Sequence, residues 1–99
     1  MAKTTERIEV ENVTSPHHKV KVDAAKYTAM RTALMAVLPG AAPGLTPTEA
    51  IAALRPTLPA DLFPGGDKAG WWMKCVQLDL EAKGVIQRAA VPPVRLWRV

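Results

Sequence analysis

The sequence is poor in cysteine and in single-ring aromatic residues: among its 99 residues there is one cysteine, one phenylalanine and one tyrosine. A lone cysteine cannot form a disulfide within the chain, and we expect Cys75 to be a small buried apolar side chain rather than a nucleophile. No apolar run approaches the roughly 18 residues of a membrane-spanning helix, and no charged segment followed by an apolar one indicates export. These absences predict a globular protein that resides in the cytoplasm.

Catalytic and metal-binding patterns are also missing from the sequence. No Ser/His/Asp, Cys/His or paired-carboxylate arrangement is legible, and a chain of this length forms one domain, too small for a deep cleft between domains. His17 and His18 have no second group of ligand residues at metal-binding spacing, which favours a polar turn. Gly65 and Gly66 precede a helix start but lack the spacing of a phosphate-binding loop. We therefore expect a protein that is not an enzyme and uses no metal or cofactor.

Acidic residues are scarce in the last third of the chain. The whole sequence has 13 Lys and Arg against 9 Asp and Glu, a formal charge of +4. Within residues 67–99 the acidic residues are Asp67, Asp79 and Glu81. The basic residues of the same third are Lys68, Lys74, Lys83, Arg88, Arg95 and Arg98. This distribution is compatible with binding to phosphate groups, although many basic domains have no nucleic-acid partner.

The clearest helical signal in the chain is DKAGWWMKCVQLDLEAK, residues 67–83. Its apolar spacing of four, three and four residues predicts a face that packs into the core. That face consists of Trp71, Cys75, Leu78 and Ala82. We expect Asp67 to cap the start of the helix and Gly84 to end it in a left-handed conformation.

The same helix carries a second apolar stripe, Trp72, Val76 and Leu80, which we expect to be covered by another element or by a partner chain. Asp79 and Lys83 can form an i,i+4 ion pair beside this stripe. The remaining side forms a narrow polar arc of Gly70, Lys74, Gln77 and Glu81.

Two further helices are predicted before this one. Residues 24–38 have a helical apolar spacing after Asp23, a plausible N-cap, and Pro39 and Gly40 follow them. Residues 47–55 follow a capping-box pattern in which Thr46 is the N-cap, proline comes next and Glu49 is the third helical residue. The segment PTLPADLFPGG, eleven residues with three prolines, then forms a long and partly buried connection.

Short strands are predicted at both ends of the chain. Val85 and Ile86 begin one strand, and residues 94–98 form a second after a proline-containing loop. Near the start, RIEVENV and KVKV alternate apolar and charged residues, so residues 1–22 form either a flexible arm or a short hairpin. If ordered, this segment could lie over the stripe that begins at Trp72. Residues 23–99 form the main domain.

This order of elements resembles the winged helix-turn-helix superfamily over about residues 24–99. The resemblance is carried by LTPTEAIAAL, which looks like the second helix, and by LDLEAKGVIQR followed by RLWRV, which looks like the third helix and the wing. With its GGDKAGWW entry to the third helix, the chain also resembles small bacterial winged-helix-like proteins of unknown function. The resemblance implies a mainly α fold with a small β component (α+β), namely three helices and a C-terminal β-hairpin wing.

Two functions remain open. For many members the resemblance implies binding to double-stranded DNA as a regulator, with a homodimer expected because one small domain makes few base contacts. By position, Lys74 and Gln77 would reach base edges, and the phosphate contacts would be Lys68, Arg88, Arg95 and Arg98. The eleven-residue connection departs from the short turn usual in DNA-binding members. The alternative is a protein-interaction or structural module that forms homo-oligomers through Trp72, Val76 and Leu80.

Overall fold

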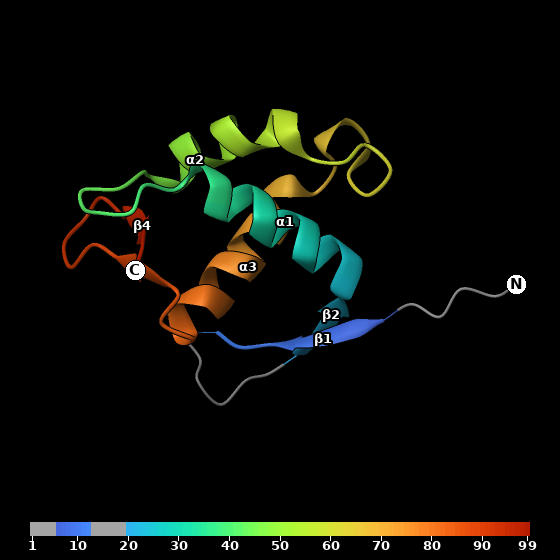
Figure 1. The fold of residues 1–99 in the computed structure, drawn as a ribbon, viewed down its shortest axis with the longest axis horizontal. Helices are drawn as coiled ribbons and strands as arrows, with labels where there is room; N and C mark the ends of the chain where they lie inside the picture. Colours follow the sequence, from blue (N-terminus) through green and yellow to red (C-terminus); the bar gives the residue numbers. More distant parts are fainter. Residues whose placement is uncertain (1–5, 13–19) are drawn as a thin grey trace, which may run out of the picture.

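The computed structural model describes residues 6–12 and 20–99 and shows a small α+β fold, the class predicted from the sequence (Figure 1). Helix α1 lies between α2 and the β1–β2 hairpin in this view. The described elements, in chain order, are β1 (Arg7–Val10), β2 (Val20–Asp23), α1 (Ala24–Val37), α2 (Pro47–Leu54), the 3-10 turns η1 (Arg55–Thr57) and η2 (Pro64–Gly66), α3 (Ala69–Ala82), β3 (Ile86–Arg88) and β4 (Leu96–Arg98).

The starts of α1 and α2 are capped as the sequence predicts. The Asp23 side chain accepts a hydrogen bond from the backbone N–H of Lys26, 3.1 Å away. The Thr46 hydroxyl accepts from the Glu49 N–H, and the Glu49 carboxylate accepts from the Thr46 N–H. These bonds satisfy backbone donors that have no partner inside the helix, so both helices begin at defined residues.

Helix α3 begins one residue later than predicted. Lys68, not Asp67, occupies the N-cap, and it does so in a left-handed conformation (φ 57°) without a side-chain cap. The end of the helix agrees with the prediction. The N–H of Val85 donates to the Leu80 carbonyl, the N–H of Gly84 donates to the Glu81 carbonyl, and Gly84 has φ +71°. This is the Schellman pattern, which favours glycine because its φ is positive.

The connection between α2 and α3 is long and partly buried, as predicted. Phe63 is its anchor, with 2% of its surface exposed, and its ring meets the Trp72 ring edge-on with centroids 6.4 Å apart. Leu58 and Leu62 pack against the same core. The chain between the two helices is therefore held in place by burial and not by a tight turn.

The N-terminal segment forms a hairpin in its described part. β1 and β2 pair antiparallel, with Ile8 opposite Val22 and Val10 opposite Val20. Val10 and Val22 belong to the same core as the helices. The domain boundary predicted after residue 22 thus falls inside β2, whose last residue, Asp23, also caps α1. His17 and His18 lie outside the described residues.

The second strand pair is tied to the loop before α2. β3 and β4 pair antiparallel, and Leu45 forms an isolated bridge to Leu96 through two backbone hydrogen bonds of 2.9 and 2.8 Å. Gly44 makes this approach possible. It has φ +76°, and a Cβ atom there would collide with the Leu96 backbone.

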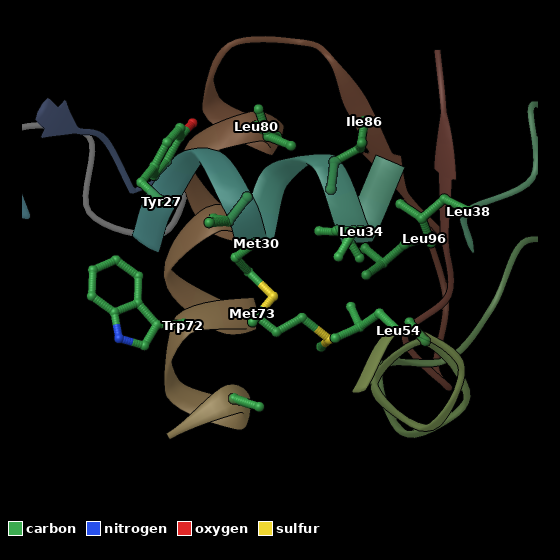
Figure 2. Close-up of a cluster of buried hydrophobic side chains, with 14 of the residues drawn as sticks. Tyr27, Met30, Leu34, Leu38, Leu54, Trp72, Met73, Leu80, Ile86 and Leu96 are labelled. Atoms are coloured by element: carbon green, nitrogen blue, oxygen red, sulfur yellow. The ribbon is translucent and has the colours of Figure 1, made fainter. Parts of the chain in front are cut away.

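The core lies where α1 crosses α3 and meets α2 and the β3–β4 hairpin (Figure 2). Tyr27 and Trp72 lie at one end of the cluster in this view, and Leu38 and Leu96 lie at the other. Met30, Leu34, Leu54, Val76 and Leu96 have no measurable exposure. Within the described ranges, no helix is both long and apolar enough to cross a membrane.

Candidate functional site

The core face predicted for α3 is wrong, because the two apolar stripes of this helix are exchanged. Trp72, Val76 and Leu80 are 8%, 0% and 1% exposed and pack into the core of their own chain. They are therefore not available as the oligomer interface that the sequence analysis proposed. Trp71, placed in the core by that analysis, is 59% exposed. Cys75 and Leu78 are half-buried, and Ala82 is exposed.

The physical reason is the width of the two stripes. Ala69 and Met73 are also buried and extend the Trp72 stripe to a broad apolar arc. Helix α3 packs its broader arc against two helices and a buried loop, because the free energy gained by burial grows with the apolar area removed from water. The narrower stripe is left on the outer side of α3.

A groove runs along this outer side, between α3 and the β1–β2 hairpin. Its volume is about 250 Å³. We call it the Trp71 groove, and its lining residues are Val10, Glu11, Asn12, Val20, Trp71, Lys74, Cys75 and Leu78. The sequence left open whether the N-terminal segment is a flexible arm or a hairpin. Its described part is a hairpin, and Val10 and Val20 of that hairpin line the groove beside Trp71.

Asp79 fixes the hairpin wall of the groove to α3. Its carboxylate is fully buried and accepts a 2.8 Å hydrogen bond from the backbone N–H of Glu11. It also accepts from the Tyr27 hydroxyl, and the Lys83 ammonium lies 2.9 Å away. The ion pair with Lys83 was predicted from the i,i+4 spacing. The burial of Asp79 and its bond to the hairpin were not predicted.

The titration of two groups near Asp79 follows from burial. Burial, the hydrogen bond to Asp79 and the carboxylate's charge all raise the pKa of Tyr27 above its ordinary value of 10.0. Burial, and secondly the charge of Asp79, raise the pKa of the Cys75 thiol. A thiol with a raised pKa is protonated at neutral pH, so Cys75 acts as an apolar lining residue and is not activated as a nucleophile.

A second groove, of about 370 Å³, lies between the start of α2, α3 and the β3–β4 hairpin. It brings together three of the six predicted nucleic-acid contacts, Lys74, Gln77 and Arg88. Lys68, Arg95 and Arg98 are not among its lining residues. Its lining also includes the apolar residues Ile51, Met73 and Val94.

Most of the predicted nucleic-acid contacts already bond within the chain. Gln77 is 4% exposed and donates to the Glu81 carboxylate, so the prediction that it lies on an exposed polar arc is wrong. Arg88 donates to both oxygens of the same carboxylate, at 2.7 and 3.0 Å. A bidentate pair of this kind holds the guanidinium in place and offsets its charge.

The other predicted contacts differ in how free they are. Arg98 donates from Nε to the Leu38 carbonyl at 2.9 Å, and Arg95 lies 3.8 Å from the Glu49 carboxylate. Lys68 and Lys74 are exposed, and neither forms an ion pair with any described residue. These two lysines are therefore the cations of the set with the greatest freedom to bind an anion.

Sequence reasoning missed two features of the site, the outward direction of Trp71 and the burial of Asp79. A usable signal existed for Asp79, since it stands between Leu78 and Leu80 on a largely apolar helix. An acid at such a position is expected to have internal donors. For the two tryptophans the signal was the width of the apolar arcs, since Ala69 and Met73 extend the arc of Trp72. Among the described residues, no group of three or more His, Cys, Asp and Glu is arranged to hold a metal ion.

No curated protein and no solved structure matches the chain. One family model does match, and it covers residues 7–96, from the start of β1 into β4. The chain therefore belongs to the family described as Family of unknown function (DUF6958).

Proposed function

We propose that this protein is a protein-interaction module whose contact surface is the Trp71 groove. The observation that carries the proposal is the 59% exposure of Trp71 beside a groove lined by apolar side chains from two elements. Tryptophan is costly to leave in water and is enriched among the residues that dominate binding energy at protein interfaces.

The surroundings of Trp71 support the same role. Val20, on the hairpin wall, is 43% exposed, and Cys75 and Leu78 form a half-buried floor. Lys74 and Glu11 add one charge of each sign to the lining. An apolar centre with a polar rim is the usual anatomy of a protein–protein contact. The proposed role requires no catalytic group.

The fixed position of the hairpin adds a further argument. Because Asp79 bonds to the Glu11 N–H and is itself buried, the two walls of the groove are held at one separation. A surface that is formed before binding loses little conformational entropy when a partner docks.

The proposal can be tested by photo-crosslinking in the cell. A photoreactive phenylalanine analogue is placed at position 71 and, in a control protein, at position 91. Val91 is a suitable control because it is 71% exposed and apolar but does not line the groove. We expect irradiation to produce defined adducts from position 71 and not from position 91. Adducts at equal, low levels from both positions would overturn the proposal.

Binding to duplex DNA is a second candidate, favoured by the exposure of Lys68 and Lys74 and by the resemblance to winged-helix proteins. The burial of Gln77 and the bond between Arg88 and Glu81 argue against this candidate. They leave α3 few free side chains that can form hydrogen bonds with a base edge.

The two candidates separate in a direct titration. Fluorescence anisotropy with a labelled random duplex at low and moderate salt measures phosphate binding. The interaction proposal expects no salt-sensitive binding. A micromolar affinity that falls steeply with salt and is lost in the Lys68→Ala/Lys74→Ala double variant would instead favour the DNA candidate.

A further inference from the structure

We infer that the occupant of the Trp71 groove is a second copy of this chain, docked about a two-fold axis. This inference rests on the proposed function and names its partner. In the dimer, Trp71 of each copy enters the groove of the other, and Lys74 of each copy faces Glu11 of the other.

The first reason is that an exposed large side chain and a groove lie next to each other on the same surface. Trp71 projects at the edge of a groove that it also helps to line. A two-fold interface uses the same patch on both copies, so a projecting residue and the cavity that receives it must lie side by side on that patch. The groove, at about 250 Å³, is smaller than the roughly 300–1,000 Å³ of most small-molecule sites. Its size suits one large side chain better than a free ligand.

Charge complementarity is the second reason. Lys74 stands on the α3 wall of the groove and Glu11 stands on the hairpin wall. Neither side chain forms an ion pair within the described part of the chain. A two-fold axis that runs along the groove places the α3 wall of each copy against the hairpin wall of the other, so each lysine meets the other copy's glutamate. The surface is thereby complementary to itself and not to a strongly acidic or strongly basic partner.

The outer stripe of α3 is the third reason. Trp71, Cys75, Leu78 and Ala82 follow one another at intervals of four, three and four residues, so they form one continuous apolar stripe along α3. Trp71 and Ala82 are exposed, and Cys75 and Leu78 are half-buried. A helix that is apolar on two sides is normally covered on both, and the core covers one.

The test reverses the charge at position 74 or at position 11, because this distinguishes a contact between two copies from a contact within one copy. Lys74→Glu and Glu11→Lys are each made alone, and sedimentation equilibrium measures mass from low to high micromolar concentration. We expect the wild-type chain to dimerise and each variant to dissociate, with a dissociation constant raised roughly tenfold or more, because two like-charge contacts replace two attractive ones. Lys68→Glu, on the same helix but outside the groove, should leave the mass unchanged.

Mixing the two variants is the decisive step. The glutamate introduced at position 74 of one chain then faces the lysine introduced at position 11 of the other, and the unaltered pair is also complementary. An equimolar mixture is therefore expected to regain the dimer mass that neither variant shows alone. An interaction inside one chain cannot be restored in this way.

Trp71→Ser provides an independent variant, with Val91→Ser as its control. Loss of a central aromatic contact is expected to raise the dissociation constant roughly 30-fold or more, while the control leaves it unchanged. Circular dichroism confirms in each case that the variant is folded. Because Trp71 is exposed, the fold does not depend on it.

The outcomes are distinguishable. A wild-type chain that stays at the mass of one copy, or a dimer that neither charge variant weakens, would overturn the second-copy inference. The interaction proposal would survive that result if position 71 still crosslinks in the cell to a protein of another mass. Absence of both self-association and crosslinks would overturn both.

Discussion

At the scale of single residues, Asp79 is the polar group on which the arrangement of the hairpin depends. It is fully buried and accepts hydrogen bonds from the Glu11 N–H and the Tyr27 hydroxyl, with Lys83 as its ion-pair partner. Removing one member of such a network leaves buried donors without a partner, which costs more than the net strength of the bonds.

Replacement of Asp79 by alanine should lower the free energy of unfolding by roughly 2–4 kcal/mol, because two buried donors lose their acceptor. Lys83→Ala is the matched control. The Lys83 side chain is 38% exposed, so its removal should cost only about 0.5 kcal/mol. Urea denaturation of the two variants measures the difference. Equal losses would show that Asp79 stabilises the fold only through its ion pair with Lys83.

The raised pKa of Tyr27 predicts a loss of stability in alkaline solution. In the unfolded chain Tyr27 loses its proton near its ordinary pKa of 10.0, whereas in the folded protein it keeps the proton to higher pH. The contribution of Tyr27 to the free energy of unfolding is therefore fully present below pH 10. Above pH 10 this contribution falls by at most about 1.4 kcal/mol per pH unit. Unfolding should be measured between neutral pH and pH 11.

Tyr27→Phe is expected to lack this component, since phenylalanine does not titrate. Cys75, whose pKa is also raised, is present in both proteins, so the difference between the two curves reports the Tyr27 hydroxyl together with its interaction with Cys75. Parallel stability curves for the two proteins above pH 10 would contradict the assignment.

At the scale of elements, α3 determines which apolar surfaces are buried in the core and which stay exposed. The sequence predicts its Gly84 end, which is confirmed, but it assigns the core face to the stripe of Trp71, which is wrong. The arc that is buried is the broader one, to which Ala69 and Met73 belong. The Phe63 ring packs against Trp72, and Met73 and Val76 lie in the same buried core as residues of α1 and α2.

The two tryptophans should therefore differ sharply when each is replaced by alanine. Trp72→Ala removes a buried ring and is expected to cost roughly 3–5 kcal/mol of unfolding free energy. Trp71→Ala removes an exposed ring whose contact is an edge-on pair with Trp72 at 5.1 Å, and about 1 kcal/mol is expected. Thermal or urea unfolding at low protein concentration excludes effects of association. A larger loss for Trp71 would reverse the assignment of the faces.

At the scale of the whole molecule, the described hairpin and the helices form one core. Val10 and Val22 are buried together with Tyr27 and Leu80, and the Glu11 N–H donates to α3. At the other end, Leu45 and Leu96 connect the loop before α2 to β4. Contacts between distant parts of the chain thus close both ends of the molecule.

One consequence is that the hairpin and α3 should open together. In native-state hydrogen exchange, the Glu11 amide is expected to exchange with an opening free energy close to that of the amides in the middle of α3, because both are released by the same unfolding event. The Lys21 amide, on an exposed part of β2, serves as the comparison. Rapid exchange of Glu11 would show that the hairpin opens by itself.

The sequence alone determined part of the local structure of this protein. The caps at Asp23 and Thr46 and the left-handed Gly84 follow from interactions between residues close in the chain, and these are visible in sequence spacing. The tertiary structure decided which side of α3 faces inward, that Asp79 is buried and that Arg88 is held by Glu81. Each of these depends on a competition for burial or pairing among distant segments, and local spacing does not measure it.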